Sequence, residues 1–474
     1  MAEPRVSPVE RRMSDVEALM WNLEKDPYLA SSFGNVTVLD QAPDVEGLRR
    51  RLAAAVHRVP RLQQRVVPAV GRLAPPEWHD DPEFDINYHV RRIALPAPGT
   101  ERQLFDLASL LASTPLDRTR PLWEFTVIEG LEGGRAALFQ KIHHTVMDGE
   151  SGVRMSVEFL DVERFPAEPE PAKDVSSTDG ASEGEDSDGG GGFVATALET
   201  ATHNLRRQLG VTRRALSGAA SLVRHPERIP AVGTDVVAGA QSLLRQMAVT
   251  DLAHSSLWTE RSLRRRFEVL RLPLDDTKRA AKALGGSIND LFVAGAVAGA
   301  GKYHRAKGAD VDELRITMPV STRTKGSTDA NAFTPTRVLL PAGDLDPETR
   351  MTTIRERLGT TKGERAIGLA SSLAGVMNVL PTSVLVRFAR QQVETVDFAT
   401  SNVRGAPFNL YIAGALIEAN YPMGPTGGTA FNLTLLSSGG SLDMGCNIDV
   451  AAIDDPDLLR RCLEDSYAEL LAFA

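Results

Sequence analysis

Two hydrophobic periods alternate along the first 165 residues. Val16, Leu19, Met20 and Leu23 recur at helical spacing, and Ser14 with Glu17 has the spacing of a capping box, so the pattern predicts a helix over 13–23. Apolar and polar residues then alternate over 34–40, as in a half-buried strand. A second helix is expected from Asp44 to Pro60, a strand region over 84–95, and a helix over 101–113.

The next two apolar runs predict a β-hairpin. Residues 122–129 and 135–143 are strand-like, and they are joined by the Gly-containing turn 131–134. The second strand ends in the adjacent pair His143 and His144. A helix is expected over 149–162, so the histidines lie where a strand turns into a helix.

The second half of the chain repeats this mixture of elements. Ser287 and Asp290 again have capping-box spacing, at the start of an Ala/Gly-rich helix. Strands are expected over 267–272, 314–320, 336–341, 410–418, 430–437 and 441–450, and helices over 274–284, 287–305, 347–365, 370–396 and 455–473. The fold class is therefore α/β (α+β), with two sandwich-like halves.

Length and charge divide the chain further. At 474 residues it is too long for one ordinary core. Residues 166–192 carry eight acidic residues and one lysine, which is −7 of the net charge of −9, and they are rich in Gly, Ser and Pro. We expect an N-terminal domain over 1–165, a disordered acidic linker over 166–192, a helical connector over 193–254 and a C-terminal domain over 255–474.

Composition argues against several classes of protein. The acidity is confined to one segment, and there is neither a basic domain nor a nucleic-acid reader motif, so no nucleic-acid partner is expected. We expect no membrane-spanning helix, since no run of about 18 apolar residues occurs. The polar N-terminus and the two cysteines, Cys446 and Cys462, favour a reduced, cytoplasmic protein.

The histidine turn carries the candidate chemistry. His144 is suited to accept a proton near neutral pH, and Asp148 could orient its ring, fix its tautomer or brace the turn. Gly149 suits a positive φ or a close backbone approach. Adjacent residues of a strand point to opposite faces, so His143 and His144 would not bind one zinc ion. The absence of a G-x-S-x-G elbow weakens a serine-hydrolase interpretation.

The segment His143–Gly149 resembles the HHxxxDG motif of the bacterial wax ester synthase/acyl-CoA:diacylglycerol acyltransferase family. Further segments resemble other motifs of that family, in the same order: Pro115–Trp123, Ser287–Asp290, Met318–Ser321, Asn331–Phe333 and Thr400–Gly405. The resemblance covers nearly the whole chain outside the acidic linker. Arg404 and Ala406 depart from it, since they replace two prolines of the last motif.

The resemblance implies two chloramphenicol-acetyltransferase-like domains with the active site in a tunnel between them. It implies acyl transfer from long-chain acyl-CoA to diacylglycerol or a fatty alcohol, with acyl-CoA as a substrate and no cofactor. His144 would be the base, Asp148 its carboxylate, His143 a supporting residue and Gly149 a turn residue. Asn289 is a candidate oxyanion donor; alternatively, it braces the packing at a helix N-terminus.

Three alternatives stay open. Related enzymes with the same histidine turn condense thioesters of carrier proteins, and a lipid-binding pseudoenzyme would retain the fold without turnover. The arginine-bearing helix from Phe193 could lie on a membrane or lipid droplet, although packing on a domain is the more ordinary role of such a helix.

Overall fold

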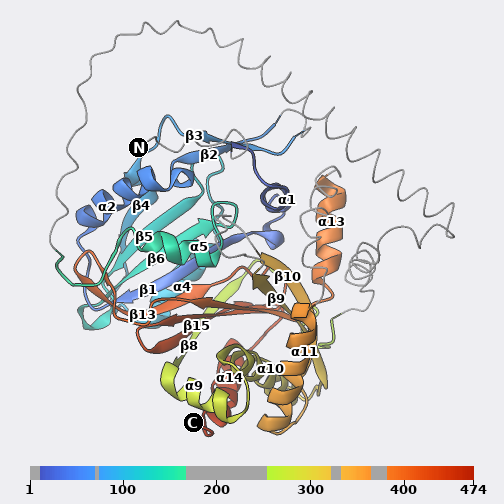
Figure 1. Cartoon of the computed structure of the whole chain (residues 1–474). Coiled ribbons are helices and arrows are strands. Elements are labelled where there is room, and N and C mark those ends of the chain that lie inside the picture. The colour runs from blue at the N-terminus through green and yellow to red at the C-terminus, as the bar shows by residue number, and fades with distance from the viewer. Residues whose placement is uncertain (1–10, 70–73, 167–252, 322–332, 364–381) are drawn as a thin grey trace, which may run out of the picture.

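The computed structural model describes residues 11–69, 74–166, 253–321, 333–363 and 382–474. The predicted acidic linker and the connector helices lie almost entirely outside these residues, and so does the part of the predicted 370–396 helix before residue 382. Two β-sheets stack one above the other in Figure 1, with α9, α10, α11 and α14 on the outer side of the lower sheet. This arrangement agrees with the predicted α/β fold class.

The N-terminal half contains five α-helices and seven strands among the described residues. The capping box predicted for the first helix is confirmed. The backbone N–H of Ser14 donates to the carboxylate of Glu17 (2.7 Å), and the backbone N–H of Glu17 donates to the hydroxyl of Ser14 (3.2 Å). The elements are α1 (Asp15–Leu23), β1 (Ser32–Leu39), α2 (Val45–Arg58), β2 (Gln64–Val67), β3 (Glu77–Asp80), α3 (Ile86–His89), β4 (Val90–Ala94), α4 (Glu101–Ser113), β5 (Trp123–Glu129), β6 (Ala136–His143), α5 (Gly149–Ser156) and β7 (Leu160–Asp161).

The C-terminal half begins with β8. Its Ala/Gly-rich helix α10 is buried along most of its length, and the predicted capping box of Ser287 and Asp290 is present. The elements are β8 (Arg265–Pro273), α9 (Leu274–Ala283), α10 (Ile288–Ala306), β9 (Glu313–Ser321), β10 (Phe333–Pro341), α11 (Pro347–Gly363), α13 (Thr382–Val393), β11 (Phe398–Arg404), β12 (Tyr411–Ile412), β13 (Ala415–Met423), β14 (Phe431–Ser438), β15 (Ser441–Asp449) and α14 (Pro456–Leu471).

The two sheets do not follow the linear order of the chain. The upper sheet runs β4-β5-β6-β1-β13-β12-β7, so β12 and β13 cross over from the C-terminal half. The lower sheet runs β10-β9-β11-β14-β15-β8. Because β13 pairs with β1 along Gly34 to Leu39, a boundary near residue 255 does not separate the two sheets.

Three predicted elements need correction. The predicted 84–95 strand region is a strand only over Val90–Ala94, preceded by the short helix α3. The predicted 410–418 strand was wrong as one element: Ala413 (φ 44°) and Gly414 (φ 86°) make a tight turn that splits it into β12 and β13. Helix α5 ends at Ser156 rather than near 162, because the chain turns there into β7.

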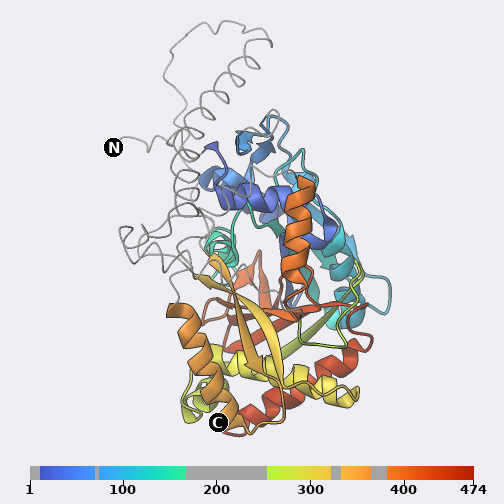
Figure 2. The same ribbon diagram turned by 90° about the vertical axis from the view of Figure 1, so that its right-hand side faces the viewer.

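Hydrophobic side chains join the halves beside the crossing strand. Phe105 of α4 contacts Phe267 of β8 and Tyr421 of β13 edge-on, with ring centroids 5.8 Å apart in both pairs. On the opposite side, α13 stands beside the N-terminal half (Figure 2), and Arg390 forms a bidentate ion pair with Asp26. These contacts fix the halves on either side of the histidine turn.

Candidate active site

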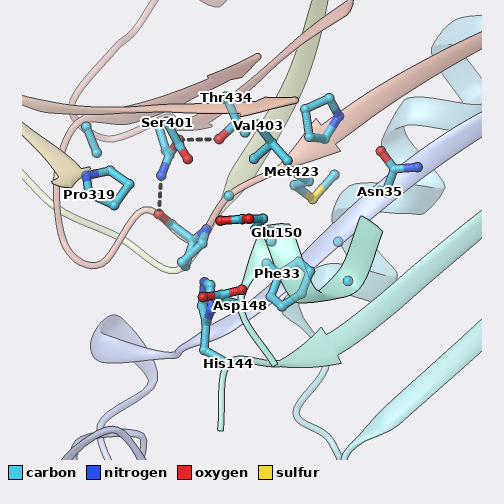
Figure 3. Close-up of a pocket in the computed structure, with 18 of the residues that line it drawn as sticks. Phe33, Asn35, His144, Asp148, Glu150, Pro319, Ser401, Val403, Met423 and Thr434 are labelled. Carbon is cyan, nitrogen blue, oxygen red and sulfur yellow. Dashed lines mark hydrogen bonds between the residues drawn. The ribbon is translucent and has the colours of Figure 1, made fainter. Parts of the chain in front are cut away.

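A cavity of about 1160 Å³ lies between the two halves. Figure 3 shows Phe33, His144 and Asp148 on one side and Ser401, Val403 and Thr434 across from them. Most of the lining is apolar, and α1, α5 and α13 contribute much of it: Val16, Leu19, Met20, Leu23, Val153, Phe388 and Val393. Such a lining suits long aliphatic chains.

His144 lies at the wall of this cavity, directly after the end of β6. Its backbone N–H donates to the carbonyl of Ser31 (3.1 Å), and Val146 N–H donates to the carbonyl of His143 (2.9 Å), which closes the turn. The imidazole packs against Phe33 with ring centroids 4.6 Å apart. The position predicted for His144, at a strand end next to a turn, is confirmed.

Burial, and to a lesser extent the nearby His143, lower the pKa of His144 from its ordinary value to about 4. The carboxylates of Asp148 and Glu24 act in the opposite direction, because they favour the protonated ring. His144 is therefore neutral at neutral pH. A neutral imidazole next to carboxylates is able to accept a proton, and the charge that develops is then stabilised.

Asp148 braces the turn that presents His144. It is the N-cap of α5, and its carboxylate accepts a hydrogen bond from Ser151 N–H (2.8 Å). The side chain is buried and lines the cavity. Of the roles considered from the sequence, the structure therefore shows the bracing role, together with the electrostatic effect on His144.

His143 points away from the cavity into the N-terminal half. Nδ1 accepts the backbone N–H of Thr145 (3.0 Å), so in the neutral ring the proton lies on Nε2, which is hydrogen-bonded to Glu24 at the end of α1. The two histidine rings thus have separate surroundings, as expected for neighbours at a strand end. This geometry agrees with a supporting role for His143.

Gly149 begins α5 next to the opposite half of the protein. A Cβ atom at this position would lie 3.3 Å from Val403 Cγ2 of β11, which is tighter than ordinary van der Waals contact. Of the two reasons considered for a glycine here, close approach is the one that the structure shows, since Gly149 is not among the positive-φ glycines.

Asn289 lies outside the cavity lining, in contact with a residue of the cavity wall. It is not among the residues that line the cavity, but its Oδ1 accepts a hydrogen bond from Asn402 Nδ2 (3.2 Å), and Asn402 does line it. The structure therefore brings His144, Asp148 and Gly149 to the cavity, with Asn289 and His143 as supports of its wall. A role of Asn289 as oxyanion donor stays a prediction.

A polar group inside this cavity was missed by the sequence reasoning. Asn35 and Thr37 of β1 and Asn420 of β13 line the wall and are hydrogen-bonded to one another. The alternation of β1 contains the signal, because residues 33, 35 and 37 share one face while Val36 and Val38 lie on the other.

Comparisons with known proteins identify the family of the chain. The family model of the wax ester synthase/diacylglycerol acyltransferase catalytic domain matches residues 13–292, and that of the C-terminal domain of the same family matches residues 330–471. The chain belongs to this family. It is an acyltransferase of the diacylglycerol O-acyltransferase type.

Relatives extend over the full length of the chain. A putative diacylglycerol O-acyltransferase of Mycobacterium tuberculosis is 35% identical over 485 residues, which cover 100% of this chain and 94% of that protein. The probable diacylglycerol O-acyltransferase tgs1 of the same organism is 30% identical, with 95% and 93% covered.

Solved structures share the fold. A wax ester synthase/diacylglycerol acyltransferase from Marinobacter aquaeolei matches with a TM-score of 0.61 and 22% identity, covering 97% of this chain and 98% of that one. The first condensation domain of the calcium-dependent antibiotic synthetase matches with a TM-score of 0.60 and 17% identity, covering 98% and 96%. The predicted fold class is thereby confirmed.

Within the described residues, no single helix has the length and apolar character needed to cross a membrane. The pair α9 and α10 satisfies both conditions together, but the two helices meet at a bend of 89°.

Proposed function

We propose that this acyltransferase moves a long-chain acyl group from acyl-CoA to the hydroxyl of diacylglycerol or a fatty alcohol, with His144 as the general base. The observation that carries the proposal is the place of His144: a neutral imidazole in the wall of a large, mainly apolar cavity between the two halves. The membership of the family supports the choice of donor and acceptors.

In the proposed reaction the acyl group passes directly from the thioester to the acceptor hydroxyl. The acceptor hydroxyl loses its proton to His144 while its oxygen attacks the thioester carbonyl carbon. The tetrahedral intermediate then collapses, the carbon–sulfur bond breaks, and the proton passes from His144 to the thiolate of CoA. An ester replaces a thioester without change of oxidation state, so the chemistry requires no cofactor.

Charge develops at two places during this reaction. The imidazolium formed at His144 is stabilised by Asp148 and Glu24, which already favour its protonated form. The oxyanion needs a hydrogen-bond donor on the opposite side of the carbon. The sequence made Asn289 the candidate for that donor. Because Asn289 contacts Asn402 of the cavity wall rather than lining the cavity, we propose that it acts by supporting the donor.

Apolar substrates suggest that the protein collects them at a membrane or lipid-droplet surface. Val157, which follows α5, and Phe165 are 72% and 78% exposed. Both lie in the segment that carries Ser156 and Leu160, two residues of the cavity wall. Sedimentation with phospholipid vesicles tests this: Phe165→Asp should reduce the bound fraction, and unchanged binding would count against it.

An acceptor screen tests the proposed reaction. Purified protein is incubated with labelled palmitoyl-CoA and either diacylglycerol or hexadecanol, and the products are separated by thin-layer chromatography. His144→Ala should abolish ester formation with an unchanged circular dichroism spectrum, while His57→Ala on the exposed face of α2 serves as the matched control. Full activity of His144→Ala would remove the proposed base.

Two other outcomes lead to different functions. Turnover only with an acyl group on a carrier protein would indicate a condensation-type enzyme. Binding of palmitoyl-CoA without any ester product, across both acceptors, would indicate a lipid-binding protein.

A further inference from the structure

We propose that Asn35, Thr37 and Asn420 form a binding site for the outer amide of a pantetheine arm, and that Arg271 receives the phosphate at its end. This inference rests on the proposed function, because it describes how the thioester donor of that reaction is held. Three observations carry it: a polar group within an apolar cavity, its spacing from His144, and a polar opening beyond it.

The polar group is preorganised. Asn35 Nδ2 donates to Thr37 Oγ1 (2.8 Å) and to Asn420 Oδ1 (3.1 Å), and Thr37 Oγ1 donates to Asn420 Oδ1 (2.7 Å). Asn420 Nδ2 donates to Ser438 of β14 (3.3 Å), so the group joins both sheets across the cavity. An acyl chain has no polar atoms to match these amides, and burying them against methylene groups is costly.

Two hydrogen-bonding positions are left for a ligand. Asn35 Oδ1 is buried and has no hydrogen-bond partner in the ranges that the structure describes. The Nδ2 group of Asn420 uses one of its two hydrogens in the bond to Ser438. One acceptor and one donor on two neighbouring side chains match the N–H and C=O of a secondary amide. The ester groups of diacylglycerol offer acceptors only, and its one hydroxyl is needed at His144 in the proposed reaction.

The spacing along β1 fits such an arm. Phe33, which packs against His144, and Asn35 lie on the same face of the strand, about 7 Å apart at the usual rise per residue. The thioester carbon must lie beside His144. The number of bonds between that carbon and the outer amide of pantetheine is about that in two to three residues of backbone. In an extended arm the amide is therefore about 7 to 10 Å from the thioester carbon.

A second cavity of about 410 Å³ lies next to the first, and Ile417 and Ser438 are in the lining of both. Arg271 of β8 lines the second cavity with its side chain 48% exposed. Its Nε is 3.1 Å from the buried Asp443, and its Nη2 donates to the Glu418 carbonyl (2.8 Å) and to Ser441 (3.2 Å).

Arg271 lies at the right distance for the phosphate. Ile417, the neighbour of Glu418, pairs with Leu39 of β1. Leu39 lies six residues after Phe33, which packs against His144. At the usual rise per residue of a strand, this opening is therefore about 17 to 20 Å from the histidine turn. The extended arm from thioester carbon to phosphate spans about 15 Å, and the arginine side chain covers the remainder. The carboxylate of Glu418 also lines the opening, but it lies 4.0 Å from Arg135 on the neighbouring β-hairpin.

A series of truncated donors tests the site. Ester formation is measured with palmitoyl-CoA, palmitoyl-pantetheine, which lacks the phosphate, and palmitoyl-N-acetylcysteamine, which also lacks the outer amide. Asn35→Leu should raise KM about tenfold for the first two donors and leave the third unchanged, since about one hydrogen bond is lost. Arg271→Gln should raise KM for palmitoyl-CoA alone. Thr126→Val, a buried hydroxyl of β5 outside the cavity lining, is the matched control.

The outcomes separate this site from the reaction. If Asn35→Leu changes KM equally for all three donors, or for none of them, the proposed amide site is overturned. Calorimetric binding of CoA, measured without acceptor, keeps the test independent of turnover: weaker binding by Asn35→Leu supports the site even if no ester forms. A palmitoyl-carrier protein, tested as a further donor, distinguishes the source of the arm. If only this donor is turned over, and Asn35→Leu reduces that turnover, the same site binds the arm of a carrier protein.

Discussion

The carboxylate of Glu24, at the C-terminal end of α1, is hydrogen-bonded to Nε2 of the buried His143, at the end of β6. This pair joins the first helix to the strand end that presents His144. His143 also lowers the pKa of His144, and Glu24 partly offsets that effect. The position and the basicity of the proposed base therefore both depend on a contact outside the cavity.

Removing this contact should affect stability and rate together. Glu24→Ala should lower the free energy of unfolding by about 1 to 3 kcal/mol, because a buried imidazole N–H loses its acceptor. It should also lower kcat, while Glu24→Gln, which keeps an acceptor oxygen, should restore much of both. Chemical denaturation and ester formation measure the two effects. Glu46→Ala, an exposed partner of Arg49, is the control and should change stability by less than about 0.5 kcal/mol.

The low pKa of His144 predicts the pH dependence of the reaction. A base with a pKa of about 4 stays deprotonated down to about pH 5, so kcat/KM should be constant from neutral pH to that point and fall below it. Palmitoyl-pantetheine is the better donor for this profile because it has no phosphate that titrates. A midpoint near 6.5, the ordinary value for histidine, would show that the ring is not desolvated during the reaction.

The same shift predicts how stability depends on pH. The folded-state pKa of His144 is below the unfolded value, so between about pH 6.5 and 4 the unfolded chain binds the proton more readily. Stability should therefore rise with pH across this interval. In His144→Gln this contribution is absent, and the free energy of unfolding should vary less steeply between pH 4 and 6.5. An unchanged slope would contradict the pKa assigned to His144.

Local patterns were enough to predict much of this fold. The capping boxes at Ser14 and Ser287, the β5–β6 hairpin and the position of His144 depend on neighbouring residues, and all are present in the structure. The crossing of β13 into the N-terminal sheet could not be predicted, since strand partners are chosen by tertiary packing. For the same reason Asn35 and Asn420, separated by 385 residues, could not be assigned to one polar group.

Asn289 and Asn402 give a test of the oxyanion prediction. A direct donor to the oxyanion should cost about 10²- to 10³-fold in kcat when it is removed. Because Asn289 contacts Asn402 rather than lining the cavity, we expect Asn289→Ala to lower kcat by about tenfold or less, with KM for palmitoyl-CoA unchanged. Steady-state kinetics distinguish a supporting role from direct donation. A loss of kcat above about 100-fold would make Asn289 a direct donor to the oxyanion.

Gly445 permits the crossing strand to lie against the lower sheet. A Cβ atom at this position in β15 would come within 1.9 Å of the carbonyl oxygen of Pro422 in β13, so Gly445→Ala must separate the two strands. We expect a loss of several kcal/mol in unfolding free energy, of the order seen for overpacked cores, with loss of activity as the cavity wall shifts. Gly359→Ala in α11 is the matched control. Nothing lies within 4 Å of its Cβ position, so alanine should stabilise that helix by about 0.5 to 1 kcal/mol. Equal stability of the two variants would show that β13 does not need this close approach.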